Sequence, residues 1–190
     1  MSRSYTLKKR AESQAETRRR IVEAAVELHG TLGPARTTIS QIADRAGVQR
    51  KTYYAHFPDE RALLLACSGL HAERHPFPDM ERLSGIADAE KRLRAGLAAL
   101  YQWYEANARL LSIVFRDAES HAPTREVAEL RYAPLMARLT EVLAADLSPP
   151  QRGLLQLALA FPTWQTLHSE AKLGRTAAVD LMTRAIASLR

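Results

Sequence analysis

The chain has 190 residues, enough for one or two domains with a buried core. Hydrophobic residues make up 46% of it and charged residues 25%, as in an ordinary globular protein. The longest apolar stretch, around Leu154–Trp164, contains Gln156 and Pro162 and is too short to cross a bilayer. A single cysteine, Cys67, excludes an internal disulfide. Because the N-terminus also lacks the apolar segment of a signal peptide, we predict a cytoplasmic protein that does not enter the membrane.

The net charge of +6 is concentrated at one end of the chain. Residues 1–57 contain 11 Lys and Arg against 5 Asp and Glu, whereas residues 58–190 contain 16 of each kind. This asymmetry favours a basic head that binds a polyanion, joined to a neutral body.

The first 15 residues are polar and basic, with Arg3, Lys8, Lys9 and Arg10 and no periodic apolar pattern. We predict a flexible basic arm over residues 1–15. A disordered tail and an arm that enters a DNA groove are both consistent with this composition.

A first helix is predicted from Glu16 to about His29. Ile21, Ala25 and Leu28 recur at the spacing of one buried helix face. A segment with two glycines and a proline then ends this helix.

Residues 37–57, TTISQIADRAGVQRKTYYAHF, predict two short helices around a turn. Thr38 and Gln41 form a capping-box pattern at the start of the first of them. Gly47 allows the left-handed turn that ends it. The second of them is expected to turn three residues inward: Val48, Tyr53 and Phe57.

The same second helix also carries a polar and basic set of side chains: Arg50, Lys51, Thr52, Tyr54 and His56. A basic helix held against a small apolar core is the layout of a helix-turn-helix, whose second helix enters the major groove of DNA.

The rest of the sequence also predicts helices and no strand. Asp59 is a candidate N-cap for a helix from about Glu60 to His75. Further helices are predicted over residues 88–107, 109–119, 124–146 with a bend at Pro134, from Ser148 to about Lys172 with Pro162 inside it, and 176–189.

Thr17–Leu65, about a quarter of the chain, resembles the tetracycline-repressor (TetR) family of helix-turn-helix transcriptional regulators. The resemblance lies in IVEAAVELHGTLG, TTISQIADRAGV, the T-x-Y-x-H-F run at Thr52–Phe57, and RALLLA after it. It implies an all-α fold of about nine helices. A helix-turn-helix domain is then expected over residues 16–58 and a helical ligand-binding and dimerisation domain over residues 59–190.

By position, the resemblance makes Arg50, Lys51 and Tyr54 the readers of base edges. Hydroxyl, imidazole and helix-terminal groups suit phosphate oxygens instead. The expected DNA-binding residues are therefore Thr38, Gln49, Arg50, Lys51, Thr52, Tyr54 and His56.

Two positions depart from the family pattern. Gln49 stands where the family usually has Ser or Thr, so the cap of the recognition helix is expected to be weak. Glu60 replaces a common lysine, with Arg61 beside it. If that lysine grips a phosphate, this chain either lacks the grip or supplies it from Arg61.

Cys67, His71 and His75 recur every four residues on one predicted helix, which is a possible arrangement for soft-metal ligands. Three ligands on one straight helix span roughly 12 Å, too far to converge easily on one ion. A buried cysteine with two surface histidines is the alternative.

The resemblance implies a small-molecule pocket in the C-terminal part, and such pockets combine apolar walls with a few polar groups. The candidate lining residues are Trp103, Tyr104, Phe115, Arg116, Tyr132, Trp164 and His168. Arg116 could instead form a salt bridge with an acidic neighbour. The aromatic residues could equally form a core.

The last two predicted helices carry more apolar surface than their mutual packing needs, and the resemblance makes them a homodimer interface. These features together predict a ligand-responsive regulator, a repressor, that binds a pseudo-palindromic operator in double-stranded DNA without a cofactor. A metal-responsive regulator and a ligand-independent DNA-binding protein are the alternatives. No glycine phosphate loop, G-x-S-x-G or H-E-x-x-H motif indicates an enzyme.

Overall fold

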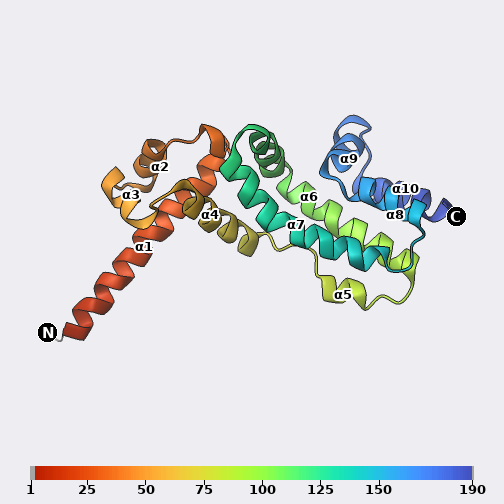
Figure 1. Cartoon of the computed structure of the whole chain (residues 1–190), viewed down its shortest axis with the longest axis horizontal. Helices are drawn as coiled ribbons and strands as arrows, with labels where there is room; N and C mark the ends of the chain where they lie inside the picture. The colour runs from red at the N-terminus through yellow and green to blue at the C-terminus, as the bar shows by residue number, and fades with distance from the viewer. Residues whose placement is uncertain (1–2, 190) are drawn as a thin grey trace. The chain divides into compact units, whose positions relative to one another are not determined.

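The computed structural model describes the backbone of residues 3–189 and the side chains of residues 7–189. Within residues 3–189 the secondary structure is helical and contains no strand, which confirms the predicted all-α fold (Figure 1). The elements are α1 (Arg3–His29), η1 (Pro34–Arg36), α2 (Ile39–Ala46), α3 (Arg50–His56), α4 (Glu60–Arg74), α5 (Met80–Ser84), α6 (Ala89–Ser120), α7 (Ala122–Ala144), α8 (Pro149–Leu159), α9 (Phe161–Gln165), η2 (Thr166–Glu170) and α10 (Arg175–Ser188). None of these helices is both long enough and apolar enough to span a bilayer.

The chain divides into two compact units. Unit 1 comprises Met1–Arg74 and Arg109–Arg131, and unit 2 comprises His75–Ala108 and Tyr132–Arg190. This division differs from the boundary expected after residue 58, because α4 and the segment 109–131 belong with the helix-turn-helix.

Hydrogen bonds explain why α4 joins unit 1. The guanidinium of Arg131 on α7 donates to the Leu65 carbonyl and to the Ser68 hydroxyl of α4, at 2.9 and 3.1 Å. At the start of α4, the Asp59 carboxylate accepts from the Ala62 amide at 2.7 Å, so the predicted N-cap is confirmed.

The core of the helix-turn-helix lies between α1, α2, α3 and α4. Its buried members are Ile21, Val22, Ala24, Ala25, Ile42, Ala46, Tyr53, Phe57, Leu63 and Cys67. Thr38 and Gln41 form the predicted capping box, and Gly47 has the predicted left-handed backbone, with φ of 64°. Local signals in the sequence therefore predict the start and the end of α2 correctly.

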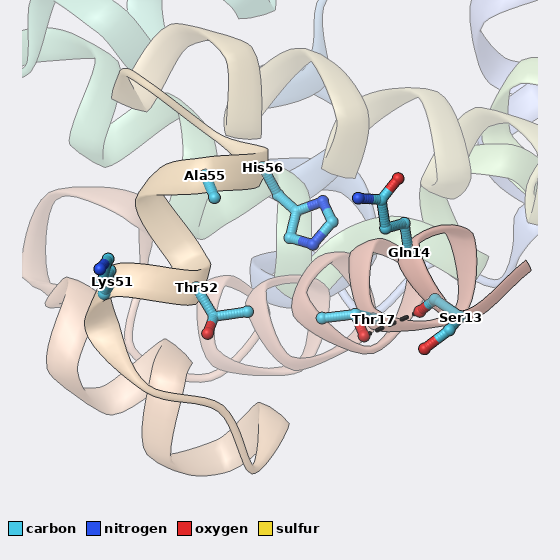
Figure 2. A pocket seen from close by; sticks show the side chains of 7 residues that line it. All are labelled: Ser13, Gln14, Thr17, Lys51, Thr52, Ala55 and His56. Carbon is cyan, nitrogen blue, oxygen red and sulfur yellow. Dashed lines mark hydrogen bonds between the residues drawn. The ribbon is translucent and has the colours of Figure 1, made fainter. Parts of the chain in front are cut away.

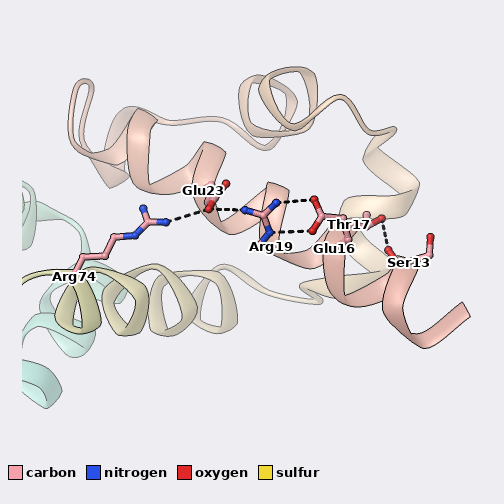
Figure 3. A network of polar contacts seen from close by, with 6 residues as sticks. All are labelled: Ser13, Glu16, Thr17, Arg19, Glu23 and Arg74. Atoms are coloured by element: carbon pink, nitrogen blue, oxygen red, sulfur yellow. Dashed lines mark hydrogen bonds and ion pairs between the residues drawn. The ribbon is translucent and has the colours of Figure 1, made fainter. Parts of the chain in front are cut away.

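α1 begins at Arg3, whereas the sequence predicts a flexible arm over residues 1–15 and a helix from Glu16. Residues 1 and 2 lie outside the described residues. The residues that follow are rich in Lys, Arg, Ala, Gln and Glu, which favour helix even where no apolar face is present. Near the middle of α1, Arg19 pairs with Glu16 and Glu23, and Arg74 of α4 also reaches Glu23 at 3.1 Å (Figure 3).

Two further predictions of helix boundaries differ from the structure. The segments expected over 88–107 and 109–119 form the single helix α6, since no glycine or proline separates them. The helix expected from Ser148 to Lys172 is interrupted at Ala160, where Pro162 occupies the first turn of α9 rather than a helix interior. Pro134 lies inside the continuous helix α7.

A buried carboxylate joins the loop after α1 to α6 within unit 1. The side chain of Asp117 is 4% exposed and accepts from the Ala35 amide at 3.0 Å and from the Arg116 guanidinium at 2.7 Å. Gly33 has φ of 100°, and a Cβ there would lie 2.3 Å from an Asp117 oxygen. Only glycine therefore fits both the backbone and the contact at this position.

His29 lies at the end of α1 and is also buried in unit 1. Burial lowers its pKa to about 4, with nearby Asp117 opposing the shift and His121 adding to it. The folded protein therefore holds a neutral imidazole where the unfolded chain takes up a proton below its ordinary pKa of 6.5.

We predict that replacing Thr38 with Ala lowers the free energy of unfolding by about 1 kcal/mol, because the cap of α2 is removed. Urea unfolding measures the change. Ser40→Ala is the matched control, since Ser40 is exposed on the same helix. Equal losses in both variants would show that the cap contributes nothing.

A second prediction concerns pH. The pKa of His29 is lower in the folded state, so protonation favours unfolding, and stability should fall from about pH 6.5 down to about pH 4. The full contribution is roughly 3 kcal/mol. Urea unfolding across this range should show a weaker pH dependence for His29→Gln than for the wild type.

Candidate nucleic-acid interface

Two aromatic side chains seat α3 on the core of unit 1. Tyr53 is 2% exposed and Phe57 1%, and their ring centroids lie 6.0 Å apart. The guanidinium of Arg18 covers the Phe57 ring at 4.9 Å. Burial also raises the pKa of Tyr53 to about 12. The predicted inward positions of Tyr53 and Phe57 are confirmed.

The opposite face of α3 is open to solvent. Arg50 and Lys51 are exposed, and Tyr54 is 45% exposed with its ring edge-on to Tyr53. Thr52 and His56 are half-buried. Among residues 7–189, none of the Arg50, Lys51, Thr52 and His56 side chains is hydrogen-bonded or ion-paired. These polar groups are therefore available to a partner outside the chain.

The two predicted helix starts on this side of unit 1 behave differently. The Thr38 hydroxyl already accepts from the Gln41 amide at 3.2 Å, so it caps α2. Gln49 occupies the N-cap position of α3 without a side-chain cap. The weak cap expected from Gln49 is confirmed.

A hollow of about 360 Å³ lies between α1 and α3 (Figure 2). We call it the α1–α3 hollow. It is lined by Ser13, Gln14, Thr17, Lys51, Thr52, Ala55 and His56. The sequence pattern identified Lys51, Thr52 and His56 but missed Ala55 and the residues on α1. The sequence gives little indication of these α1 residues, because three polar residues on an exposed helix form no recognisable motif.

Five of the seven candidate effector residues lie in unit 2: Trp103, Tyr104, Tyr132, Trp164 and His168. The ring of Trp103 meets Tyr104 and Tyr132 at 5.8 Å each. The Trp164 ring stacks on His168 at 5.1 Å with an interplanar angle of 10°. These five residues therefore form an aromatic cluster, in which Tyr104 also contacts Trp164.

The other two candidates, Phe115 and Arg116, belong to unit 1. Arg116 is bound to Asp117 and donates to the Leu32 carbonyl at 3.3 Å, which is the salt-bridge alternative for this residue. Phe115 is 38% exposed. Neither residue shares the aromatic cluster of unit 2.

The proposed metal ligands include a thiol with an unfavourable environment. Cys67 is buried, which raises its pKa to about 12 and keeps it protonated, whereas metals bind the thiolate. The described part of the chain contains no group of three or more His, Cys, Asp and Glu side chains placed to hold a metal ion.

Comparison with known proteins identifies relatives of the N-terminal part of the chain. Residues 21–67 match the family model for "Bacterial regulatory proteins, tetR family". The regulator TtgR of Pseudomonas putida is 38% identical over 119 residues, which cover 63% of this chain and 50% of TtgR. The activator FasR of Mycolicibacterium smegmatis is 28% identical over 102 residues, covering 54% and 47%. The chain spans 32% to 50% of the length of the curated relatives that it matches.

Solved structures extend the similarity to the fold of most of the chain. NalD of Pseudomonas aeruginosa superposes with a TM-score of 0.63 at 22% identity, covering 93% of this chain and 96% of that one. FadR of Bacillus subtilis, solved with stearoyl-CoA, gives 0.61 at 18% identity, covering 89% and 97%. Residues 21–67 are therefore similar in sequence to the tetR family of bacterial regulatory proteins, and the solved structures show the same fold over most of the chain.

Proposed function

We propose that this chain is a transcriptional regulator that binds double-stranded DNA by placing α3 in the major groove. One observation carries the proposal: Tyr53 and Phe57 fasten α3 to the core while Arg50, Lys51 and Tyr54 remain exposed on its other face. A rigid helix with free cationic donors is what base-edge recognition requires. The charge excess of residues 1–57 supports the same partner.

Within this interface the residues take two roles. Arg50 and Lys51 donate to acceptors on base edges, above all to guanine, and Tyr54 contacts the neighbouring base. The smaller polar groups hold the backbone phosphates and fix the position of the helix along the DNA. The phosphate contacts in this proposal are Thr38, Gln49, Thr52 and His56.

The protein acts as a homodimer through α8 and α10. Leu155 and Ile186 are buried within the chain, whereas Leu157 is 59% and Leu181 42% exposed on these two helices, which pack together in unit 2. Exposed leucines on adjacent helices suit a four-helix contact with a second copy. Two heads would then read a pseudo-palindromic operator whose half-sites are about 34–36 Å apart, or a multiple of that distance.

In this proposal the DNA-bound protein represses transcription. A small-molecule effector that binds unit 2 then releases the DNA. The aromatic cluster of unit 2 is the proposed binding region, because ligand pockets are lined mainly by apolar and aromatic side chains. FadR, one of the structurally similar proteins, binds stearoyl-CoA, and NalD is a repressor of a multidrug efflux pump. Coupling of this kind is reciprocal, so operator DNA must weaken effector binding by the same factor.

We predict that Lys51→Ala and Tyr54→Ala each weaken binding to a duplex selected by the wild-type protein from a random pool. The loss should be about 1–3 kcal/mol per base contact, and Lys51→Ala should also relax base preference. Fluorescence anisotropy measures both effects. Lys91→Ala is the control, because Lys91 is exposed on α6 in unit 2. Unchanged affinity in both α3 variants would remove α3 from the interface.

We also predict that Leu157→Glu combined with Leu181→Glu converts the dimer to a monomer in analytical ultracentrifugation. Buried carboxylates would face each other across the two-fold axis, at a large desolvation cost. Leu130→Glu is the matched control, since Leu130 is 54% exposed on α7 in unit 1. A wild-type protein that sediments as a monomer would contradict the dimer directly.

A further inference from the structure

Permanent and titratable contacts together hold α4 to α7 and to the connection before it, within unit 1. Arg131 of α7 donates to α4, and Arg61 at the start of α4 pairs with Glu126 of α7 at 2.6 Å. His121, the residue between α6 and α7, also approaches α4: its Nε2 lies 3.4 Å from Oε1 of Glu60. Arginine keeps its charge throughout the physiological range, whereas histidine changes charge near neutral pH. The Glu60–His121 pair is therefore a contact whose strength depends on pH.

The ring of His121 is held in a defined orientation. Its Nδ1 lies 2.7 Å from the hydroxyl oxygen of Thr124, a side chain that is itself buried. The backbone of His121 is fixed as well, because its amide donates to the Asp117 carbonyl at 2.8 Å and its carbonyl accepts from the Arg125 amide at 3.1 Å. The side chain is nevertheless 24% exposed. It can therefore exchange a proton with solvent without losing its position beside Glu60.

Protonation changes what this ring can offer to its two partners. A neutral imidazole has one N–H group, and the 3.4 Å contact with Glu60 is longer than a charge-assisted hydrogen bond of about 2.7–2.9 Å. The imidazolium has two N–H groups, so Nδ1 can donate to Thr124 while Nε2 donates to the Glu60 carboxylate. A contact between a neutral group and a carboxylate then becomes an ion pair.

The other charged groups around His121 keep their charge while it titrates. His29 of α1 lies near it, but burial lowers the pKa of His29 to about 4, so that ring is neutral well above this pH. The Asp117 carboxylate of α6 is already bound to Arg116 and to a backbone amide. Arg125 of α7 donates to two carbonyls at the end of α6. Between about pH 5.5 and pH 8, the proton on His121 is therefore the change that acts on Glu60.

Glu60 follows closely after the residue that fastens α3 to the core. Phe57 is buried, and Pro58 and Asp59 are all that separate it from Glu60. The proline ring fixes one backbone dihedral, and the Asp59 carboxylate caps α4 through the Ala62 amide at 2.7 Å. This short link has little freedom. Holding Glu60 in place therefore limits the movement of the C-terminal end of α3.

We propose that Glu60 and His121 form a proton-dependent ion pair that strengthens as the pH falls and thereby tightens the binding of α3 to DNA. The inference rests on the proposed binding of α3 to DNA. The structure that exposes the polar face of α3 also places Glu60 and His121 at contact distance, so protonation stabilises the form that presents α3. The added positive charge also favours a polyanion. The regulator then responds to acidification as well as to an effector.

A double-mutant cycle in urea unfolding tests the pair itself. The proteins are the wild type, Glu60→Gln, His121→Asn and the double variant, and asparagine is chosen because it also caps helices. The coupling between the two positions should change the equilibrium constant for unfolding by roughly two- to fivefold at about pH 5.5 and hardly at all at about pH 8. His29 is present in all four proteins, so its own pH dependence cancels.

The permanent ion pair beside it is the matched control. A cycle with Arg61→Gln and Glu126→Gln should give the same coupling at both pH values, because neither charge titrates in this range. A coupling between Glu60 and His121 that is equal at the two pH values, or absent at both, would overturn the proton-dependent pair.

Fluorescence anisotropy with a duplex selected by the wild type tests the effect on DNA at the same two pH values. The wild type should gain at least twofold more affinity on acidification than His121→Asn or Glu60→Gln, while Glu126→Gln keeps the wild-type gain. His56 on α3 also gains charge, but it is present in every protein compared. Equal gains in all four proteins would overturn the link to DNA.

Failure of the proposed function gives a different result. A wild-type protein that selects no duplex at either pH would overturn the proposed function, and the DNA part of this inference with it. The unfolding cycle would still decide whether the proton-dependent pair exists.

Discussion

The fastening of α3 by Tyr53 and Phe57 is the constraint on which the proposed interface depends. A helix of seven residues is far below the length at which helices are stable alone, so its orientation has to come from packing. Two large buried rings on one face fix both its position and its rotation about its own axis. Every side chain on the other face is thereby aimed outward at a fixed angle, which is what discrimination between base edges requires.

The helix-turn-helix also depends on a contact from a distant part of the sequence. The loop that follows α1 is held by Asp117, which is 82 residues beyond its partner Ala35 and accepts its amide at 3.0 Å. A buried carboxylate costs free energy unless it is fully hydrogen-bonded, and the Ala35 amide and Arg116 meet that need. The helix-turn-helix is therefore one unit with the end of α6 and the start of α7, and a change in that part of α6 acts directly on the loop that leads into α2.

The sequence allows the head to be predicted because its signals are local. The Thr38 cap, the left-handed Gly47 and the inward spacing of Tyr53 and Phe57 each act within a few residues. Contacts across long separations, such as that of Asp117, leave no such pattern. Apolar periodicity also fails to predict the N-terminal turns of α1. A helix that packs against nothing has no buried face, so its sequence shows no apolar repeat. For the same reason the α1 side of the α1–α3 hollow was found only in the structure.

The separation of charge along the chain limits how an effector can act under the proposed function. Residues 58–190 are electrically neutral as a whole, so the attraction to DNA phosphates originates in residues 1–57. A ligand bound among the aromatic residues of unit 2 leaves those cations in place and does not abolish non-specific attraction. It must instead alter the geometry with which two heads meet successive major grooves. Effector binding should therefore reduce affinity for the operator far more than affinity for random DNA, because only the former requires the correct spacing.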